Sequence, residues 1–221
     1  MTTYEKLADG VERVLAERRR RYEDEYERLL AAARQVMRER GTADPSVADI
    51  LAACGLSTSA FYRHFPTKDD LMVTLLRRAH DVTHRHLRER LDARRQPGER
   101  VVEWVRGMFA MLGTAELVAA NRPFLLAHPR LLERFPDQIE AGFAALTGLL
   151  ADAVREAREA AGLPAHDAEQ DARLAMHQVF GILIDHAALR RPCQAGLVDA
   201  VASYTLRAVL HPVPAPDIPG R

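Results

Sequence analysis

The sequence predicts an all-α protein. Apolar residues recur at spacings of three and four along nearly all of the 221 residues, which is the period of a helix that buries one face. No segment of the sequence shows the strict apolar and polar alternation of a half-buried strand. Glycine and proline fall mainly between the periodic segments, where they are expected to end one helix and precede the next. The chain should therefore consist of helices joined by short loops.

The first part of the chain is predicted to form four helices. Gly41 ends the first clear apolar stripe, and Gly55 separates two short helical segments. Ser46 and Ser57 stand in N-cap positions ahead of those segments. An earlier segment has weaker helical spacing because Gly10 interrupts it. The predicted helices run from about Arg20 to Arg40, for about eight residues after Ser46, from Thr58 to His64, and from Thr67 to about Arg94.

The strongest predicted domain boundary is Gln96-Pro97-Gly98. After it, the stretch RPFLLAHPRLLERFP contains prolines that should break it into one or two short helices. The proline-rich end, HPVPAPDIPGR, is expected to be extended or disordered. The helices predicted in this part are about Glu99 to Leu112, Ala115 to Ala120, Asp137 to Ala161, Asp167 to Arg190, and Ala195 to Leu210.

The length of 221 residues allows one large or two small domains with a buried core. The composition, 48% hydrophobic and 28% charged, is ordinary for a globular chain. Cys54 and Cys193 have no CxxC or zinc-finger spacing, so neither a disulfide framework nor a structural metal is indicated. The polar start MTTYEKLADG does not resemble a signal peptide, and the apolar runs are too short to cross a bilayer. We expect a cytoplasmic protein with no metal, no cofactor and no membrane partner.

Two short helices joined by a glycine-containing turn have the geometry of a helix-turn-helix, whose second helix lies in the major groove of DNA. Phe61 and Phe65 should face inward, so that Thr58, Ser59 and Tyr62 project outward. Hydroxyl groups can donate to or accept from base edges. The alternative is that these side chains merely coat a solvated helix. The residues predicted to contact DNA are Ser46, Ser57, Thr58, Ser59, Tyr62, Arg63, His64 and Lys68.

The formal net charge is zero, but the basic residues are unevenly distributed. Between Arg18 and Arg78 there are 12 Lys and Arg against 9 Asp and Glu, and four of the arginines form the run Arg18 to Arg21. This run precedes the first clear helix. It is either a solvated charged segment or an N-terminal arm that adds DNA affinity through phosphates or the minor groove.

The segment from about Tyr26 to Leu75 resembles the DNA-binding domain of the TetR family of transcriptional regulators. A first helix ending in Arg-Gly is followed by SVADILAACGLSTSAFYRHFPTKDDL, which meets the family pattern almost position by position. Leu51 and Cys54 stand where alanine is usual, and Ala60 where threonine is frequent. The resemblance implies base-edge contacts from Thr58, Ser59 and Tyr62, and phosphate contacts from Ser46, Tyr62, His64 and Lys68.

The resemblance also implies a homodimeric repressor that binds a palindromic operator in double-stranded DNA and is released by a small-molecule effector. The last two long helices would form a four-helix bundle with those of the partner. The alternative is an all-helical enzyme or carrier that retains a helix-turn-helix-like core, but Asp185-His186 lacks a nucleophile elbow and no catalytic residue is predicted. The expected parts are an extension at 1–21, a DNA-binding domain at 22–75, a connecting helix at 76–96, an effector-binding and dimerisation domain at 97–211, and a flexible tail at 212–221.

Aromatic, methionine and polar side chains in the C-terminal part are either plain core or the lining of an effector cavity. Together they favour an apolar or amphipathic effector. His80 and His84 have the spacing of a metal-binding pair, but no carboxylate or cysteine partner is identifiable. The ligand-binding candidates are Trp104, Met108, Phe109, Asn121, Arg122, Phe124, His128, Phe143, Met176, His177 and Phe180.

Overall fold

The computed structural model describes residues 3–94 and 96–210, so the tail expected at 212–221, residue 211 and residues 1–2 lie outside the described residues. Every regular element in the described part is a helix, which confirms the all-α class. The chain divides into two compact units between Leu75 and Leu76. The elements are α1 (Thr3–Arg40), α2 (Val47–Cys54), α3 (Thr58–His64), α4 (Lys68–Asp92), α5 (Pro97–Phe109), a 3-10 turn η1 (Ala110–Leu112), α6 (Ala115–Arg134), α7 (Pro136–Ala160), α8 (Ala168–Ala188) and α9 (Ala195–Leu210).

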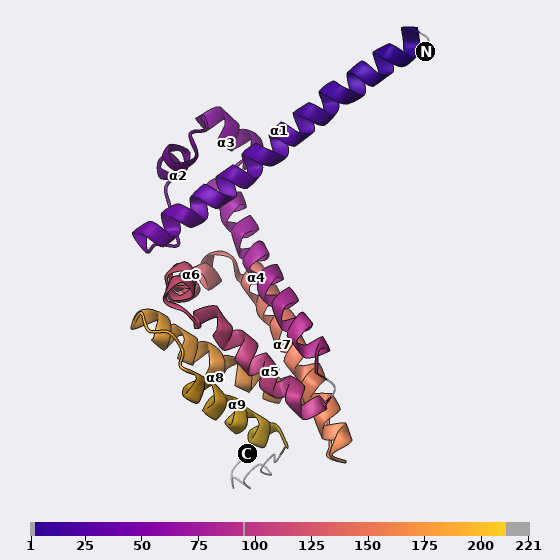
Figure 1. The fold of residues 1–221 in the computed structure, drawn as a ribbon. Coiled ribbons are helices and arrows are strands. Elements are labelled where there is room, and N and C mark those ends of the chain that lie inside the picture. Colours follow the sequence, from indigo (N-terminus) through magenta and orange to yellow (C-terminus); the bar gives the residue numbers. More distant parts are fainter. Residues whose placement is uncertain (1–2, 95, 211–221) are drawn as a thin grey trace. The chain divides into compact units, whose positions relative to one another are not determined.

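The N-terminal unit is built on α1, against which α2 and α3 pack (Figure 1). Phe61 and Phe65 of the α3 segment are buried, as predicted, and Tyr26 of α1 stacks on Phe65 with ring centroids 5.1 Å apart. Burying a side chain of this size stabilises the fold by about 1.5–3 kcal/mol. The other large core side chains of this unit are Leu29, Leu30, Val36, Met37, Ile50, Leu71, Met72 and Leu75.

Caps set the ends of the short helices. Ser46 and Ser57 are the N-caps of α2 and α3, and each side chain accepts a hydrogen bond from a backbone N–H three residues on. Gly55 ends α2 in the left-handed conformation, at a φ of 66°, where a β-carbon would be strained. At the start of α4, the N–H of Thr67 donates to Asp70 and the N–H of Asp70 donates to the Thr67 hydroxyl. The predicted caps are therefore confirmed.

Helix α1 is longer than the sequence predicts. It is continuous from Thr3, so Gly10 and the run Arg18 to Arg21 lie inside the helix and not before it. One interior glycine costs about 1 kcal/mol of helix stability, which the strong helix formers around it offset. The side chains from Glu12 to Arg21 are all exposed, and Figure 1 shows this half of α1 extending beyond α2 and α3. The arginines are therefore exposed on a continuous helix.

In the C-terminal unit, α5 packs against α7 and α9, while α8 packs against α6 and α7. Trp104 of α5 is fully buried, and its ring N–H donates to the carbonyl of Leu146 at 2.9 Å. Glu103, also buried, forms ion pairs with Arg90, Arg94 and Arg106. Burial alone would raise the pKa of Glu103, but the hydrogen bonds and charges of these arginines outweigh it and hold that pKa below its usual value.

The proline-rich stretch before α7 is one helix, which corrects the predicted break. Pro123 and Pro129 both lie inside α6. A proline removes one backbone hydrogen bond and usually interrupts a helix, but here tertiary contacts outweigh that local preference. Pro123 is buried, and the amide of Asn121 donates to the carbonyls of Met111 and Leu117 at 2.9 and 3.0 Å. The turn η1 and the helix are thereby joined.

Candidate nucleic-acid interface and ligand cleft

Helix α3 presents three hydrogen-bonding side chains to solvent. Thr58, Ser59 and Tyr62 are exposed, and Tyr62 has 53% of its surface accessible. Phe61, which precedes Tyr62, is fully buried, and its ring meets the Tyr62 ring edge-on with the centroids 5.3 Å apart. Because Phe61 anchors the helix, the exposed hydroxyls are held in fixed positions.

The two N-cap serines are also exposed, but their hydroxyl groups already have partners. Ser46 accepts from the backbone of Asp49 and donates to the Asp49 carboxylate at 2.6 Å. This hydrogen bond, together with Arg40, holds the pKa of Asp49 below its usual value. The Ser57 hydroxyl accepts from a backbone N–H of α3 at 3.2 Å. Their structural role is therefore to fix the ends of α2 and α3.

Arg63 and Lys68 are partly exposed and paired with carboxylates. Arg63 donates to Glu25 of α1, and the Nζ of Lys68 lies 2.5 Å from an oxygen of Asp44. Asp44 is exposed, and surface ion pairs contribute only about 0–1 kcal/mol. Exchanging this carboxylate for a phosphate at Lys68 would therefore cost little.

His64 corrects the expectation that its ring projects toward phosphates. Its side chain is fully buried and its ring lies 4.1 Å from the ring of Tyr22, between centroids. Its Nε2 is 3.2 Å from a carboxylate oxygen of Glu25. Residue 64 follows Phe61 by three positions and so shares the inward face of α3. Glu25, which the sequence reasoning missed, thus joins α1 to α3, and the hydrogen bonds from His64 and Arg63 lower its pKa.

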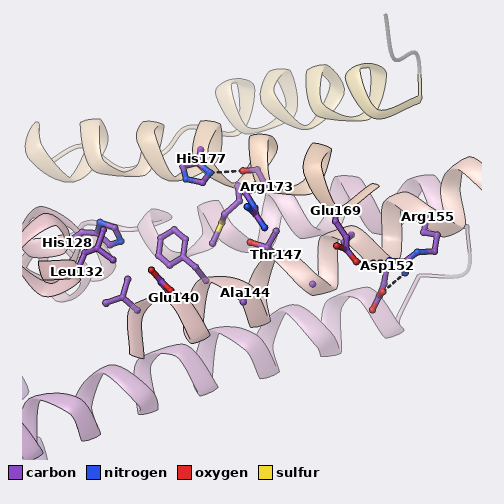
Figure 2. A pocket seen from close by; sticks show the side chains of 15 residues that line it. His128, Leu132, Glu140, Ala144, Thr147, Asp152, Arg155, Glu169, Arg173 and His177 are labelled. Carbon is purple, nitrogen blue, oxygen red and sulfur yellow. Dashed lines mark hydrogen bonds and ion pairs between the residues drawn. The ribbon is translucent and has the colours of Figure 1, made fainter. Parts of the chain in front are cut away.

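The C-terminal unit contains a cleft of about 820 Å³ between α6, α7 and α8 (Figure 2). This volume lies within the range of about 300–1,000 Å³ typical of small-molecule sites. The lining side chains are His128 and Leu132 of α6; Ile139, Glu140, Phe143, Ala144, Thr147, Gly148, Ala151, Asp152 and Arg155 of α7; and Glu169, Arg173, Met176 and His177 of α8.

Charged side chains lie at both ends of this cleft, and an aromatic cluster lies at one of them. Figure 2 shows His128, Leu132 and Glu140 at one end and Asp152, Arg155 and Glu169 at the other. Arg155 lies 2.7 Å from Asp152 and 3.9 Å from Glu169. At the first end, Phe143, Phe180 and His128 form an aromatic cluster, with centroids 4.7 to 5.1 Å apart. The cleft is therefore amphipathic.

Two histidines place hydrogen-bonding groups in this cleft. Burial, and then the charges of His80 and His177, lower the pKa of His128. The Nε2 of His128 is buried without a hydrogen-bond partner among the described residues. The Nδ1 of His177 is 2.8 Å from the carbonyl of Arg173, so that nitrogen carries a proton and donates it. In the neutral ring, the Nε2 of His177 is left as an acceptor.

Of the predicted ligand-binding residues, the structure brings together His128, Phe143, Met176 and His177 in the cleft, with Phe180 beside them. The other six do not line it. Trp104, Met108 and Phe109 are core side chains, and Phe124 is half-buried elsewhere on α6. The amide of Asn121 donates to the carbonyl of Met111, and Arg122 donates to the carbonyl of Ala187 at 3.1 Å.

Most of the α7 lining was not predicted, because the candidates were aromatic, methionine and selected polar side chains, and the α7 lining consists largely of small residues. Ala144, Thr147, Gly148 and Ala151 recur at spacings of three and four on one face of α7. Small residues at helical spacing, flanked by charged residues on the same face, leave open space against a neighbouring helix. That pattern was the available signal for the cleft.

Within residues 3–94 and 96–210, no group of three or more His, Cys, Asp or Glu is placed to hold a metal ion. In the same ranges, no helix has the length and apolar character needed to cross a membrane. Cys54 and Cys193 are free thiols, and burial raises the pKa of Cys193 to about 11. Cys193 is therefore protonated and unreactive near neutral pH.

Comparison with known proteins agrees with the geometry of the N-terminal unit. Residues 29–75 match the family of bacterial regulatory proteins described as the tetR family. This match lies within the N-terminal unit and covers the helix-turn-helix. Over 107 residues, the chain is 32% identical to the HTH-type transcriptional repressor LfrR of Mycolicibacterium smegmatis. That alignment spans about half of each protein, 48% of this chain and 55% of LfrR.

Solved structures share the fold of the chain over most of its length. The fatty acid degradation regulator FadR from Bacillus halodurans has a TM-score of 0.66 and 17% identity, covering 86% of this chain and 96% of that one. FadR from Thermus thermophilus, solved in complex with lauroyl-CoA, has a TM-score of 0.59 and 22% identity, with coverages of 89% and 98%. At such identities, the likeness shows the fold alone.

Proposed function

We propose that this chain is a sequence-specific DNA-binding transcriptional regulator, a homodimeric repressor that a small amphipathic effector releases from its operator. The observation that carries the proposal is the exposed face of α3, where Thr58, Ser59 and Tyr62 project from a helix anchored by buried Phe61. In a helix-turn-helix this face enters the major groove, and such side chains reach base edges. The repressor LfrR supports the assignment through its 32% identity to the chain.

The cleft of the C-terminal unit supports the effector part of the proposal. Its aromatic end suits an apolar group, while its charged end and the two histidines suit a polar one. The likeness to FadR proteins, one of which was solved with lauroyl-CoA, makes acylated molecules reasonable first probes. An effector that binds the DNA-incompetent state more tightly would shift the population toward it.

Two measurements test the proposal. The first is a gel-shift titration of the full chain on the DNA upstream of its own gene, repeated over a range of salt concentrations. We expect binding that persists over competitor DNA and weakens as salt rises, because phosphate contacts release counterions. The second adds laurate, lauroyl-CoA or dodecylamine to the complex, and at least one of them should release the DNA. Binding without sequence preference would contradict the first part of the proposal, and a complex unaffected by all three probes would contradict the effector class.

The alternative expected from the sequence, an enzyme or carrier with a helix-turn-helix-like core, predicts a different result. Such a protein would bind ligands in the cleft but would bind no DNA fragment specifically at any salt concentration. The gel shift therefore separates the two functions directly.

A further inference from the structure

One carboxylate of the C-terminal cleft lies without a positive partner. Glu140 of α7 is exposed and lines the cleft, and across residues 3–94 and 96–210 its side chain forms no ion pair or hydrogen bond. Its neighbours three and four positions away on α7 are Pro136, Asp137, Phe143 and Ala144, none of which is basic. Glu140 therefore contributes an uncompensated negative charge at its end of the cleft.

The charges at the other end of the cleft balance one another. Arg155 lies 2.7 Å from Asp152 and 3.9 Å from Glu169. Arg173 follows Glu169 by four residues, which places the two side chains one turn apart on the same face of α8. Two guanidinium groups and two carboxylates therefore share that end, and an anion bound there would meet both kinds of group. With neutral histidines, the excess negative charge of the lining comes from Glu140.

Aromatic rings lie at the same end of the cleft as Glu140. Phe143 follows it by three residues, and its ring centroid lies 4.8 Å from that of Phe180 and 5.1 Å from that of His128. Figure 2 shows Glu140 and His128 at this end. Ring faces attract cations, and hydrocarbon groups pack on them. The Nε2 of His177, an acceptor in the neutral ring, also suits a ligand that donates hydrogen bonds.

We propose that the effector is an amphipathic cation whose charged nitrogen binds the carboxylate of Glu140. The inference rests on the effector site proposed above and assigns the sign of the effector's charge. Hydrogen bonds between ionised groups are about twice as strong as neutral ones, so an ammonium group gains most at this carboxylate. A carboxylate ligand in the same position would instead be repelled by Glu140. The hydrocarbon part would pack on the neighbouring rings of Phe143 and Phe180.

The test compares dodecylamine with laurate, which have hydrocarbon chains of similar length and opposite charges near neutral pH. Isothermal titration calorimetry without DNA, below the concentrations at which the probes form micelles, gives the dissociation constants for the wild-type chain, Glu140→Gln and the control Glu133→Gln. Glutamine keeps the shape of the side chain and removes its charge. Glu133 is exposed on α6 and does not line the cleft, so its variant removes the same charge elsewhere. Thermal unfolding confirms that both variants are folded.

We expect the wild-type chain to bind dodecylamine more tightly than laurate. Glu140→Gln should weaken dodecylamine binding about tenfold, the effect of losing one charge-assisted hydrogen bond, and should not weaken laurate binding. Glu133→Gln should keep the wild-type dissociation constants for both probes.

Three results would overturn the inference and leave the proposed function standing. They are binding of laurate or lauroyl-CoA in preference to dodecylamine by the wild-type chain, an unchanged dissociation constant for dodecylamine in Glu140→Gln, and equal losses in the two variants. If dodecylamine, laurate and lauroyl-CoA all fail to bind the wild-type chain, the proposed effector class fails together with the inference.

Discussion

The carboxylate of Glu25 on α1 lies 3.2 Å from Nε2 of His64 on α3. The same carboxylate accepts a hydrogen bond from Arg63, so the last turn of α3 is attached to α1 through two adjacent residues. Glu25 has 15% of its side chain exposed, and His64 has none. This attachment fixes the direction of α3 relative to α1 and hence the direction in which its outer face points.

We predict that replacing Glu25 with Gln reduces the acid sensitivity of folding. Hydrogen bonds from His64 and Arg63 lower the pKa of Glu25 below its usual value. A carboxylate whose pKa falls on folding stabilises the native state above its unfolded pKa, and this contribution is lost as pH decreases through the folded value. The free energy of unfolding, measured in urea, should therefore fall more steeply below about pH 4.5 for the wild-type chain than for Glu25→Gln.

The control for this prediction is Glu17→Gln, on the exposed half of α1. Its free energy of unfolding should follow the wild-type pH profile. If the profile of Glu25→Gln also coincided with that of the wild-type chain, Glu25 would not be coupled to folding in the way the contacts indicate.

A second prediction separates recognition from packing on α3. Tyr62→Ala should weaken operator binding by about 1–3 kcal/mol if the ring or its hydroxyl reaches a base. Because Tyr62 is half exposed and meets Phe61 edge-on, the free energy of unfolding of Tyr62→Ala should fall by only about 0.5–1.5 kcal/mol. The neighbouring change Phe61→Ala should instead destabilise the fold by about 3–5 kcal/mol, since Phe61 is fully buried. Isothermal DNA titration and chemical unfolding of both variants measure the two effects.

Unchanged DNA affinity in Tyr62→Ala would remove this residue from the interface. A large loss of stability in the same variant would show that its affinity change reports folding and not recognition.

The features that sequence reasoning predicted well are local ones. Ser46, Ser57 and Gly55 set helix ends through their own side chain or backbone conformation, and they were located correctly. His64 was misplaced although its spacing of three from Phe61 puts it on the inward face of α3. Its partner on α1, Glu25, lies 39 residues away in the sequence and could not be inferred from that spacing. The unbroken α6 was missed for the same reason, since burial of Pro123 outweighs the local tendency of proline to end a helix.

The cleft illustrates a different limit. Five of the eleven ligand-binding candidates lie in it or beside it, because aromatic residues signal burial without saying whether a space remains. The open space comes from small side chains on α7, such as Ala144 and Gly148, and from their distance to the neighbouring helices. A spacing pattern in one helix cannot give that distance.

A third prediction concerns two glycines of α7 that differ in their surroundings. A β-carbon at Gly142 would lie 2.0 Å from the ring of His80 on α4, whereas a β-carbon at Gly148 would meet nothing within 4 Å. Gly142→Ala should therefore destabilise the C-terminal unit by about 1–3 kcal/mol through overpacking. Gly148→Ala should stabilise it by up to about 1 kcal/mol, the usual gain in helix propensity.

Chemical unfolding of the two variants gives the comparison, and the double variant His80→Ala/Gly142→Ala supplies the control. Removing the imidazole makes room for the new methyl group, so the second substitution should cost less in that background. If Gly142→Ala lowered the free energy of unfolding equally with and without the His80 side chain, then contact with His80 would not be the reason for a glycine at position 142.

The last prediction tests the cleft without disturbing the core. Gly148 lines the cleft with open space where its side chain would be, so Gly148→Leu should fill part of the volume while leaving the helix intact. A ligand at a concentration 100 times its dissociation constant stabilises a protein by about 2.7 kcal/mol. We therefore test laurate, lauroyl-CoA and dodecylamine for an increase in the melting temperature of the wild-type chain. A probe that gives this increase should lose the effect in Gly148→Leu. The effect should persist in Gly148→Ala, which shares the gain in helix propensity but adds only a methyl group. A full shift in the leucine variant would place the binding site outside this cleft.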